Sequence, residues 1–261
     1  MRLEHEPGTA LATVVLDRPE KRNAQTPAMW RRLAAIGGQL LADDALRVVL
    51  LRAEGSSFSA GLDRAMFTTG LEGEPGLLGL AALDDAALDE TIDGFQQAFA
   101  WWRDDRLVSI AAVQGHAVGA GFQLALGCDL RVVADDVQLA MKETSLGLVP
   151  DLGGTRPLVD LVGYARALEI CVTGRWVGAD EAVSSGLASV AVPAADLDAT
   201  ARDLAAAVLA APAGAVRATK ALLRGARNRG YHDQRAAERA AQAGRLRELA
   251  RAATATVGDT S

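Results

Sequence analysis

The stretch IAAVQGHAVGAGFQLALGCDLRVVADD, Ile110–Asp136, joins two apolar runs through a glycine-rich turn and a short helical segment. The first run ends at Gly115 and predicts a buried strand. Residues 122–129 follow the turn and predict a short helix, and residues 130–136 predict a second strand that ends in a tight Asp-Asp turn. A strand, a helix and a strand in direct succession indicate an α/β fold.

The residues before this stretch show the same alternation. Residues 9–19 and 47–55 carry compact apolar runs that predict two further strands. Between them, Thr26 followed by Pro27 predicts the start of a helix, because Thr is a good cap and Pro suits the first helical position. Residues 89–105 return to helical periodicity.

The residues after this stretch change in character along the chain. Residues 137–143 predict one more strand, and beyond residue 155 the sequence is helical almost throughout. The glycine-rich segment 64–85 lacks clean periodicity, so we expect a long loop or broken helices there. These patterns predict a core over residues 1–190 and an all-helical C-terminal region over residues 191–261.

Composition excludes several classes of protein. The chain has 261 residues, 50% of them hydrophobic, which is ordinary for a globular protein, and no apolar run approaches the roughly 20 residues of a membrane helix. Its net charge of −6 argues against nucleic-acid binding, which depends on phosphate neutralisation. The N-terminus lacks a signal-peptide pattern, and Cys128 and Cys171 lie in apolar contexts typical of reduced thiols, so we expect a cytoplasmic protein.

Two short turns contain small residues between apolar runs: SFSAGLD at Ser57–Asp63 and HAVGAG before the helix. A dinucleotide-binding turn needs a further glycine where Leu124 stands, so this interpretation is disfavoured. The first N–H groups of a helix lack partners and attract negative charge, so Ala120 could hold an oxyanion. Ala60 could offer a second N–H to the same oxygen. Either turn alone is more typical of a simple strand-to-helix connection.

Four segments together resemble the enoyl-CoA hydratase/isomerase family, the crotonase superfamily, over residues 10 to 245. They are RPEKRNA at Arg18–Ala24, FSAGLD, the opening stretch, and LGLVPDLGGTRPLVDLVG. The resemblance implies a crotonase-like spiral of ββα repeats with an all-helical C-terminal extension. It implies that this extension builds a homotrimer, which pairs into a homohexamer, and contacts coenzyme A.

The resemblance also implies the ligand and its contacts. The substrate would be an acyl-CoA thioester, with no cofactor beyond the coenzyme A that is part of the substrate and with no metal. The main-chain N–H groups of Ala60 and Ala120 would hold the enolate oxygen. Further substrate-binding residues would be Gly61, Leu62, Asp63 and Gly119, with Lys21 and Arg22 placed to meet a phosphate, and Lys220 is a weaker candidate for the 3′-phosphate.

Two positions carry the acids of the hydratases that this sequence resembles. The first position is Gln123 here, and the second is Glu143, which we expect at the end of a strand. Gln123 can hydrogen-bond a water molecule but cannot exchange a proton with it. A lone carboxylate with a raised pKa can move a proton between two carbons, so double-bond isomerisation is favoured, with Glu143 as the base.

Asp151 leaves a second interpretation open. It matches the position of a catalytic aspartate in the dienoyl-CoA isomerases of this family, and it could instead help Glu143 in a 2-enoyl-CoA hydratase. An Asp before Leu-Gly-Gly is also a natural helix N-cap. The sequence is also compatible with a non-catalytic acyl-CoA-binding protein, and with a thioester hydrolase that pairs Ser59 with His116.

Overall fold

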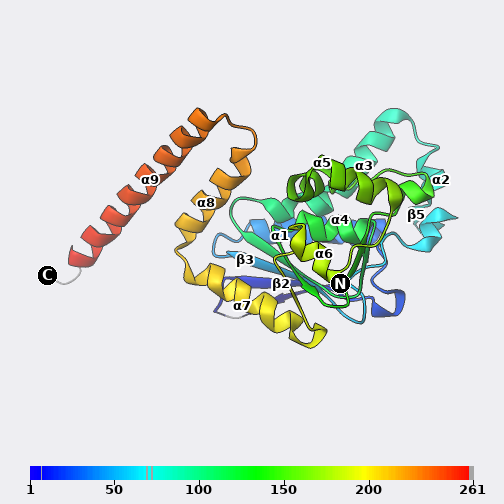
Figure 1. Cartoon of the computed structure of the whole chain (residues 1–261), viewed down its shortest axis with the longest axis horizontal. Coiled ribbons are helices and arrows are strands. Elements are labelled where there is room, and N and C mark those ends of the chain that lie inside the picture. Colours follow the sequence, from blue (N-terminus) through cyan, green and yellow to red (C-terminus); the bar gives the residue numbers. More distant parts are fainter. Residues whose placement is uncertain (7, 69, 72, 259–261) are drawn as a thin grey trace. The chain divides into compact units, whose positions relative to one another are not determined.

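The computed structural model describes residues 1–258 except residues 7, 69 and 72 (Figure 1). The chain divides into two compact units, Met1–Ala206 and Ala207–Ser261. The strands of the described residues all lie in the first unit, together with helices α1 to α6 and most of α7. The predicted α/β class is therefore correct for the unit that carries the two glycine turns.

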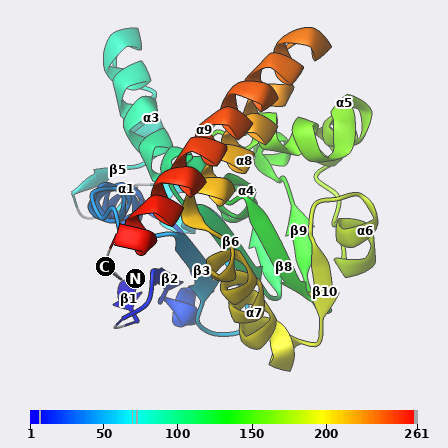
Figure 2. The same cartoon turned by 90° about the vertical axis from the view of Figure 1, so that its left-hand side faces the viewer.

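A six-stranded sheet in the order β1-β2-β3-β6-β8-β10 forms the centre of the first unit. β1 is antiparallel to β2, and the other neighbours are parallel, with β3, β6, β8 and β10 side by side in Figure 2. β2 and β6 are buried at every position, so the buried strand predicted to end near Gly115 is confirmed. The strands are β1 (Arg2–His5), β2 (Leu11–Leu16), β3 (Val48–Ala53), β6 (Val108–Val113), β8 (Leu130–Ala134) and β10 (Val190–Val192).

A second, smaller layer of extended chain contains both glycine turns. Its two strands, β7 (His116–Val118) and β9 (Gln138–Ala140), pair in parallel. Isolated β-bridges, which pair Ser59 with Ala117 and Gln25 with Leu62, extend this layer. One strand in each layer and then a helix form the repeat, as in β6, β7 and α4 (Ala120–Gly127), which agrees with the expected ββα spiral.

The turn at Asp135 and Asp136 is present, but the strands on either side do not belong to one sheet. β8 lies in the large sheet and β9 in the small layer. The Asp135 N–H donates to the Val192 carbonyl at 2.8 Å, and the Asp136 carboxylate accepts from the Gly115 N–H at 3.0 Å. These two bonds direct the chain from one layer to the other.

Helix α1 (Pro27–Leu41) begins where its cap predicts, since the Thr26 hydroxyl accepts the Met29 N–H at 3.2 Å. Helix α3 (Asp85–Ala100) follows the glycine-rich segment and runs into the 3₁₀ turn η3 (Trp101–Arg103). Trp101 and Trp102 stack with ring centres 3.9 Å apart and are buried. The glycine-rich segment itself forms short pieces: η2 (Arg64–Phe67), β4 (Gly70–Leu71), β5 (Glu74–Pro75) and α2 (Leu77–Leu80).

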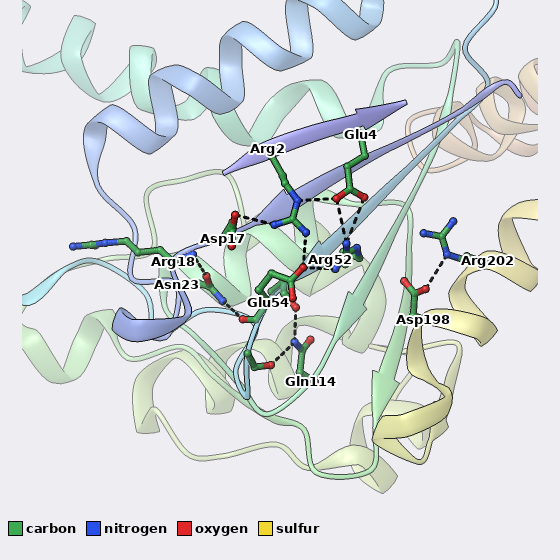
Figure 3. A network of polar contacts seen from close by, with 12 residues as sticks. Arg2, Glu4, Asp17, Arg18, Asn23, Arg52, Glu54, Gln114, Asp198 and Arg202 are labelled. Carbon is green, nitrogen blue, oxygen red and sulfur yellow. Dashed lines mark hydrogen bonds and ion pairs between the residues drawn. The ribbon is translucent and has the colours of Figure 1, made fainter. Parts of the chain in front are cut away.

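The N-terminal strand β1 has no counterpart in the sequence predictions. A network of ion pairs fixes it to its neighbours (Figure 3). The Arg2 guanidinium pairs with Glu4 at 2.7 Å, with Asp17 at 2.8 Å and with Glu54 at 2.5 Å, and Arg52 pairs with Glu54 at 2.9 Å. Such polar, partly exposed strands lack the apolar pattern from which strands are predicted.

The helices that end the chain are α5 (Thr155–Thr173), α6 (Ala179–Ser184), α7 (Leu197–Ala210), α8 (Ala213–Ala226) and α9 (Tyr231–Gly258). β10 and most of α7 fall in the first compact unit, so the unit boundary lies beyond the expected residue 190. No single helix of the described residues is long and apolar enough to cross a membrane, although the bent pair 194–210 and 213–226 meets the length and composition limits together.

Candidate active site

The two glycine turns lie directly against each other. The Ser59 N–H donates to the His116 carbonyl at 2.9 Å, and the Val118 N–H donates to the Ser59 carbonyl at 3.0 Å. A Cβ atom on Gly61 would come within 2.6 Å of the Val118 carbonyl oxygen and 3.8 Å of the Ala120 nitrogen. Because Gly61 has φ +85°, a side chain would be excluded both by the contact and by the backbone conformation.

The donor predicted in the first turn is wrong. The Ala60 N–H donates to the Arg22 carbonyl at 2.8 Å, so it is not free for a ligand. The Gly61 N–H is also used, by the Ser59 hydroxyl at 3.2 Å. The Leu62 N–H finds no acceptor among the described residues, and in this turn it shares that property with the N–H of Ser57 at the start of the turn.

The second donor agrees with the sequence hypothesis. Ala120 is the first residue of α4, and its N–H has no acceptor among the described residues. The chain enters α4 through Gly119, whose φ of +51° and ψ of −118° are open only to glycine. The free N–H groups of Leu62 and Ala120 are therefore the two donors that the paired turns present together.

A buried polar network holds the first turn in place. The Asn23 amide donates to the Glu54 and Ser57 carbonyls, both at 2.9 Å, and its oxygen accepts the Arg18 N–H at 2.8 Å. The Ser59 hydroxyl donates to the Asn23 carbonyl at 2.8 Å. Sequence reasoning missed these residues as site residues, because nothing in their local sequence shows that they meet across more than thirty positions.

Gln25 adds a second link to the same turn. Its amide nitrogen donates to the Ser59 hydroxyl at 3.2 Å, and its oxygen accepts from the Trp30 indole N–H at 2.7 Å. Its backbone accepts the Asp63 N–H at 2.8 Å. Buried groups that are fully hydrogen-bonded in this way fix a single conformation.

Glu143 lies beside the second turn. It opens the 3₁₀ helix η4 (Glu143–Leu146), and β9 ends three residues earlier at Ala140, so the expected strand-end position is wrong. Its Oε1 would lie 3.2 Å from a Cβ atom on Gly119. The residue is only 9% exposed, and its Oε2 is buried with no hydrogen-bond partner among the described residues.

The environment of Glu143 favours its protonated form. Burial raises the pKa of this carboxyl, hydrogen bonds from its own backbone and from Gln123 oppose the rise, and the negative charge of Asp151 adds to it. A carboxylate with a free, buried oxygen and a raised pKa is suited to accept and return a proton.

Gln123 is in contact with Glu143 but is not a free amide. Its nitrogen donates to Glu143 Oε1 at 2.7 Å, and its oxygen accepts the Leu152 and Gly154 N–H groups at 2.9 and 3.3 Å. Its side chain is 1% exposed. Its oxygen is thus already occupied by two donors, so it is not available to hold a water molecule.

Asp151 is close enough to affect Glu143, and it does not cap a helix. The residue that precedes α5 is Gly154, and no side chain caps that helix, so the N-cap interpretation is wrong. The Asp151 carbonyl accepts the Gln96 amide at 2.6 Å, which fixes the backbone there. Burial raises the pKa of the Asp151 carboxyl.

Asp63 follows the free donor Leu62 directly. It pairs with Arg18 at 2.6 Å, and its other carboxylate oxygen accepts the Ala65 N–H at 3.0 Å. The hydrogen bond from Ala65 and the Arg18 charge lower the pKa of Asp63 despite partial burial. The carboxylate therefore stays charged and ties this turn to the Arg18 segment.

The cationic residues that are candidates to bind a phosphate group lie at two places in the structure. Lys21 and Arg22 are exposed in the segment that follows β2, and the Arg22 carbonyl is the acceptor for Ala60. Lys220 lies on α8, in the second compact unit. Among the described residues, no group of three His, Cys, Asp or Glu side chains is arranged to hold a metal ion.

The hydrolase alternative is contradicted by the placement of its two residues. The serine beside the His116 ring is Ser57, with its hydroxyl 3.4 Å from Nδ1. The Ser59 hydroxyl is buried and donates to the Asn23 carbonyl. A nucleophilic serine needs an adjacent base, and Ser59 has none among the described residues.

Comparisons with known proteins show which family the chain resembles. The model of the enoyl-CoA hydratase/isomerase family matches residues 6–253. The chain is 34% identical over 211 residues to YngF of Bacillus subtilis (strain 168), assigned as an enoyl-CoA hydratase/isomerase; the match covers 80% of this chain and 76% of that protein. It is 32% identical over 190 residues to the mitochondrial Delta(3,5)-Delta(2,4)-dienoyl-CoA isomerase of Rattus norvegicus, covering 70% of this chain and 56% of the isomerase.

A solved structure extends the similarity to nearly the whole chain. It belongs to a Thermobifida fusca YX protein assigned as an enoyl-CoA hydratase, in complex with acetoacetyl-CoA. The two chains are 49% identical, each is covered to 94%, and the TM-score is 0.89. The fold is therefore shared over nearly the whole chain.

Proposed function

This chain belongs to the enoyl-CoA hydratase/isomerase family, in the crotonase superfamily, and is an enzyme that acts on CoA thioesters. We propose that its reaction is the isomerisation of a carbon–carbon double bond in an enoyl-CoA. The acyl-CoA assignment is supported by the Thermobifida fusca relative, which was solved with acetoacetyl-CoA. The choice between isomerisation and hydration rests on the acids beside the two turns.

The observation that carries the proposal is the pairing of one buried carboxylate with one amide whose oxygen is fully occupied. Hydration needs a water molecule held between two proton-exchanging groups. Here Glu143 is ionisable, whereas Gln123 uses its oxygen for two backbone donors and its nitrogen for Glu143 itself. Proton transfer between two carbons needs only one acid that accepts a proton and returns one, and the proton on the acid can exchange with solvent in between.

The proposed mechanism follows from the positions of three groups. The thioester oxygen would accept the free N–H groups of Leu62 and Ala120, and each donor of this kind typically stabilises a transition state by about 3 kcal/mol. With that oxygen stabilised, Glu143 Oε2 would take a proton from the carbon chain and form a delocalised enolate. The same oxygen would then deliver the proton to the other end of the allylic system, so the double bond moves and no atom is added.

A second candidate uses Asp151 as a further acid. Asp151 does not cap α5, and its carboxyl has a raised pKa and an electrostatic effect on Glu143. Two acids could serve opposite ends of a conjugated system, and the rat relative is a dienoyl-CoA isomerase. The same two acids could instead activate water, which is the hydratase alternative.

Binding of the nucleotide part is proposed from charge and exposure. Lys21 and Arg22 are exposed on the segment whose backbone holds Ala60, so a phosphate bound there would lie near the thioester turn. We propose no further cofactor and no metal. Contact of the helical region with CoA, and its assembly into a homotrimer or homohexamer, remain proposals from family resemblance.

The decisive experiment compares wild type with Glu143→Gln on 2-enoyl-CoA and 3-enoyl-CoA in deuterated water. The wild type should interconvert the two with deuterium uptake and no gain of water, and the variant should lose at least ~10³-fold in kcat/KM, because its only base is gone. Binding of acetoacetyl-CoA by calorimetry should be unchanged. Retained turnover in Glu143→Gln would contradict the proposal.

Asp151→Asn separates the candidates within the family. Simple isomerisation by Glu143 should survive this substitution with a loss of less than about tenfold. Selective loss of water addition would support the hydratase alternative, and selective loss with 3,5-dienoyl-CoA would support the conjugated isomerase. Acyl-CoA binding without exchange of α-protons in the wild type would favour a non-catalytic binding protein.

A further inference from the structure

Gln123 makes three hydrogen bonds that join two otherwise separate parts of the site. On one side its nitrogen donates to Glu143 Oε1. On the other side its oxygen accepts the Leu152 and Gly154 N–H groups, in the turn that directly follows Asp151. One side chain from the middle of α4 therefore touches both the base and the turn that carries the second acid.

The orientation of this amide is determined by its surroundings. Two backbone N–H groups face the same atom, and only an oxygen can accept both, so the nitrogen must point to Glu143. The close fit adds to this constraint, because a Cβ atom on Gly154 would lie 2.7 Å from Gln123 Cγ. The amide cannot turn over without leaving two buried N–H groups unpaired.

A fixed donor has a specific effect on its acceptor. With Oε1 of Glu143 held by Gln123, the carboxylate cannot rotate freely, and its second oxygen stays buried and without a partner among the described residues. The donated hydrogen bond also stabilises the ionised form. Burial favours the neutral form of the Glu143 carboxyl group, and the hydrogen bond from Gln123 opposes this effect. Glu143 can therefore still act as a base.

We propose that Gln123 is a positioning residue that holds the Glu143 carboxylate and the Asp151 turn in one geometry and leaves Glu143 Oε2 as the proton-transfer atom. The last part of this proposal rests on the proposed function, whereas the positioning of Glu143 does not. Position 123 is then more than a missing acid. It determines both the orientation of the Glu143 carboxylate and the fraction of it that is ionised.

The groups whose charges act on Glu143 can be named. Asp151 adds to the rise that burial causes in the pKa of Glu143. Burial, followed by the Glu143 charge, raises the pKa of Cys171, which is half-buried on α5. Lys142 adjoins Glu143 in sequence, but its ammonium donates to the Gly174 carbonyl. A change in the titration of Glu143 must therefore be compared with Asp151→Asn and Cys171→Ser backgrounds.

Two substitutions separate the bonds of Gln123. Gln123→Met keeps the length of the side chain and removes all three hydrogen bonds. Gln123→Glu keeps an acceptor for Leu152 and Gly154 and replaces only the donor to Glu143. Gln114→Met is the control, because the Gln114 amide (Figure 3) donates to the carbonyls of Ala53 at 2.7 Å and Gly55 at 3.1 Å and to neither acid.

The primary measurement is a carboxyl ¹³C NMR titration of the full chain labelled at glutamate, with the Glu143 signal identified by Glu143→Gln. In Gln123→Met the pKa of Glu143 should rise by about one unit, because a hydrogen bond to the charged form is lost. In Gln123→Glu two adjacent carboxyls should titrate in two widely separated steps. Gln114→Met should leave the Glu143 titration unchanged.

Kinetics with 3-hexenoyl-CoA give a second, independent measurement. The acid limb of the kcat/KM profile should move to higher pH with the Glu143 titration, and kcat should fall about tenfold while KM stays within about twofold. An unchanged Glu143 titration in folded Gln123→Met or in Gln123→Glu would overturn the inference. Because the titration needs no turnover, it decides the positioning of Glu143 even if Glu143→Gln proves active and the proposed function fails.

Discussion

At the scale of the residue, Glu143 combines a chemical use with an energetic cost. Its pKa is raised by burial, and one of its oxygens has no partner among the described residues. A buried carboxylate oxygen without a hydrogen-bond partner destabilises a fold. Its presence beside Gly119, whose backbone conformation only glycine adopts, therefore indicates a functional role. The proposed base should therefore be a site where activity and stability oppose each other.

Glu143→Gln should accordingly stabilise the protein at neutral pH. A raised folded-state pKa means that the native protein retains a proton which the unfolded chain releases, so wild-type stability falls as pH rises from the unfolded pKa through the folded one. The amide has no charge to bury, and we expect a gain of ~1 kcal/mol at pH 7, about 2–4 °C in Tm. The gain should vanish below about pH 4, where both states are protonated.

Glu169→Gln is the control for this prediction, because its effect on the pH dependence of stability should have the opposite sign. Its hydrogen bond from Arg175 lowers the pKa of Glu169, so Glu169 contributes stability above its ordinary pKa that is lost as pH falls through the folded value. Thermal unfolding from about pH 3.5 to 8 checks both variants. A Glu143→Gln protein that is less stable than wild type at pH 7 would contradict the cost assigned to this carboxylate.

At the scale of the element, the junction between β7 and α4 brings the donor and the base together. Gly119 turns the chain so that the Ala120 N–H is free, and its missing Cβ leaves room for the Glu143 carboxylate. Its backbone N–H donates to the Ala140 carbonyl at 2.8 Å, which ties the turn to the end of β9. The junction thus depends on one residue without a side chain.

Gly119→Ala should lose activity out of proportion to stability. The φ of +51° with ψ of −118° costs a non-glycine residue roughly 1–3 kcal/mol, and the new Cβ would press on Glu143 Oε1 at 3.2 Å. A shift of the donor and the base by a fraction of an ångström should lower kcat/KM by about 10²-fold. Kinetics and denaturant unfolding together measure the two effects.

Gly94→Ala is the matched control within a helix. Gly94 lies in α3, has no atom within 4 Å of its would-be Cβ and takes no positive φ. Alanine there should stabilise the protein by about 1 kcal/mol and leave turnover unchanged. Equal activity in the two alanine variants would show that the β7–α4 junction does not set the site geometry.

The elements that local sequence predicts correctly are those with a local cause. Thr26 caps α1, and the buried strands β2 and β6 are mostly apolar, so each can be recognised from its own residues. The hydrogen bonds of the site are non-local. The Ala60 N–H donates to the Arg22 carbonyl, whereas the Leu62 N–H is free. This difference depends on two segments almost forty positions apart, and local sequence patterns carry no information about it.

The positions around the proposed base show the same limit of prediction from local sequence. The identity of Gln123 is visible in the sequence, and so is its inability to exchange a proton. Its three hydrogen bonds depend on how residues 152–154 return to α4, which only the fold determines. The Asp151 cap is a reasonable local prediction, but the chain makes one more turn before α5 begins, and Gly154 takes the cap position.

At the scale of the whole molecule, the outer face of α5 is more apolar than an isolated chain requires. Tyr164, Leu168 and Val172 are exposed by 72%, 45% and 57%, and their spacing of four places them along one side of the helix. Trp176, just past the helix, is also exposed. Contiguous apolar patches of this kind mark surfaces where another protein surface binds.

We expect this row of α5 to be covered by self-association, in line with the homotrimer or homohexamer that the family resemblance implies. Leu168→Glu places a charge in the centre of the row and should shift light-scattering masses from three or six chains toward one, at a concentration where wild type stays associated. Ala86→Glu adds the same charge at an exposed position on a different helix, α3, and should leave the mass unchanged. A wild-type chain that stays monomeric at tens of micromolar would contradict the prediction, and equal dissociation of both variants would assign the effect to charge alone.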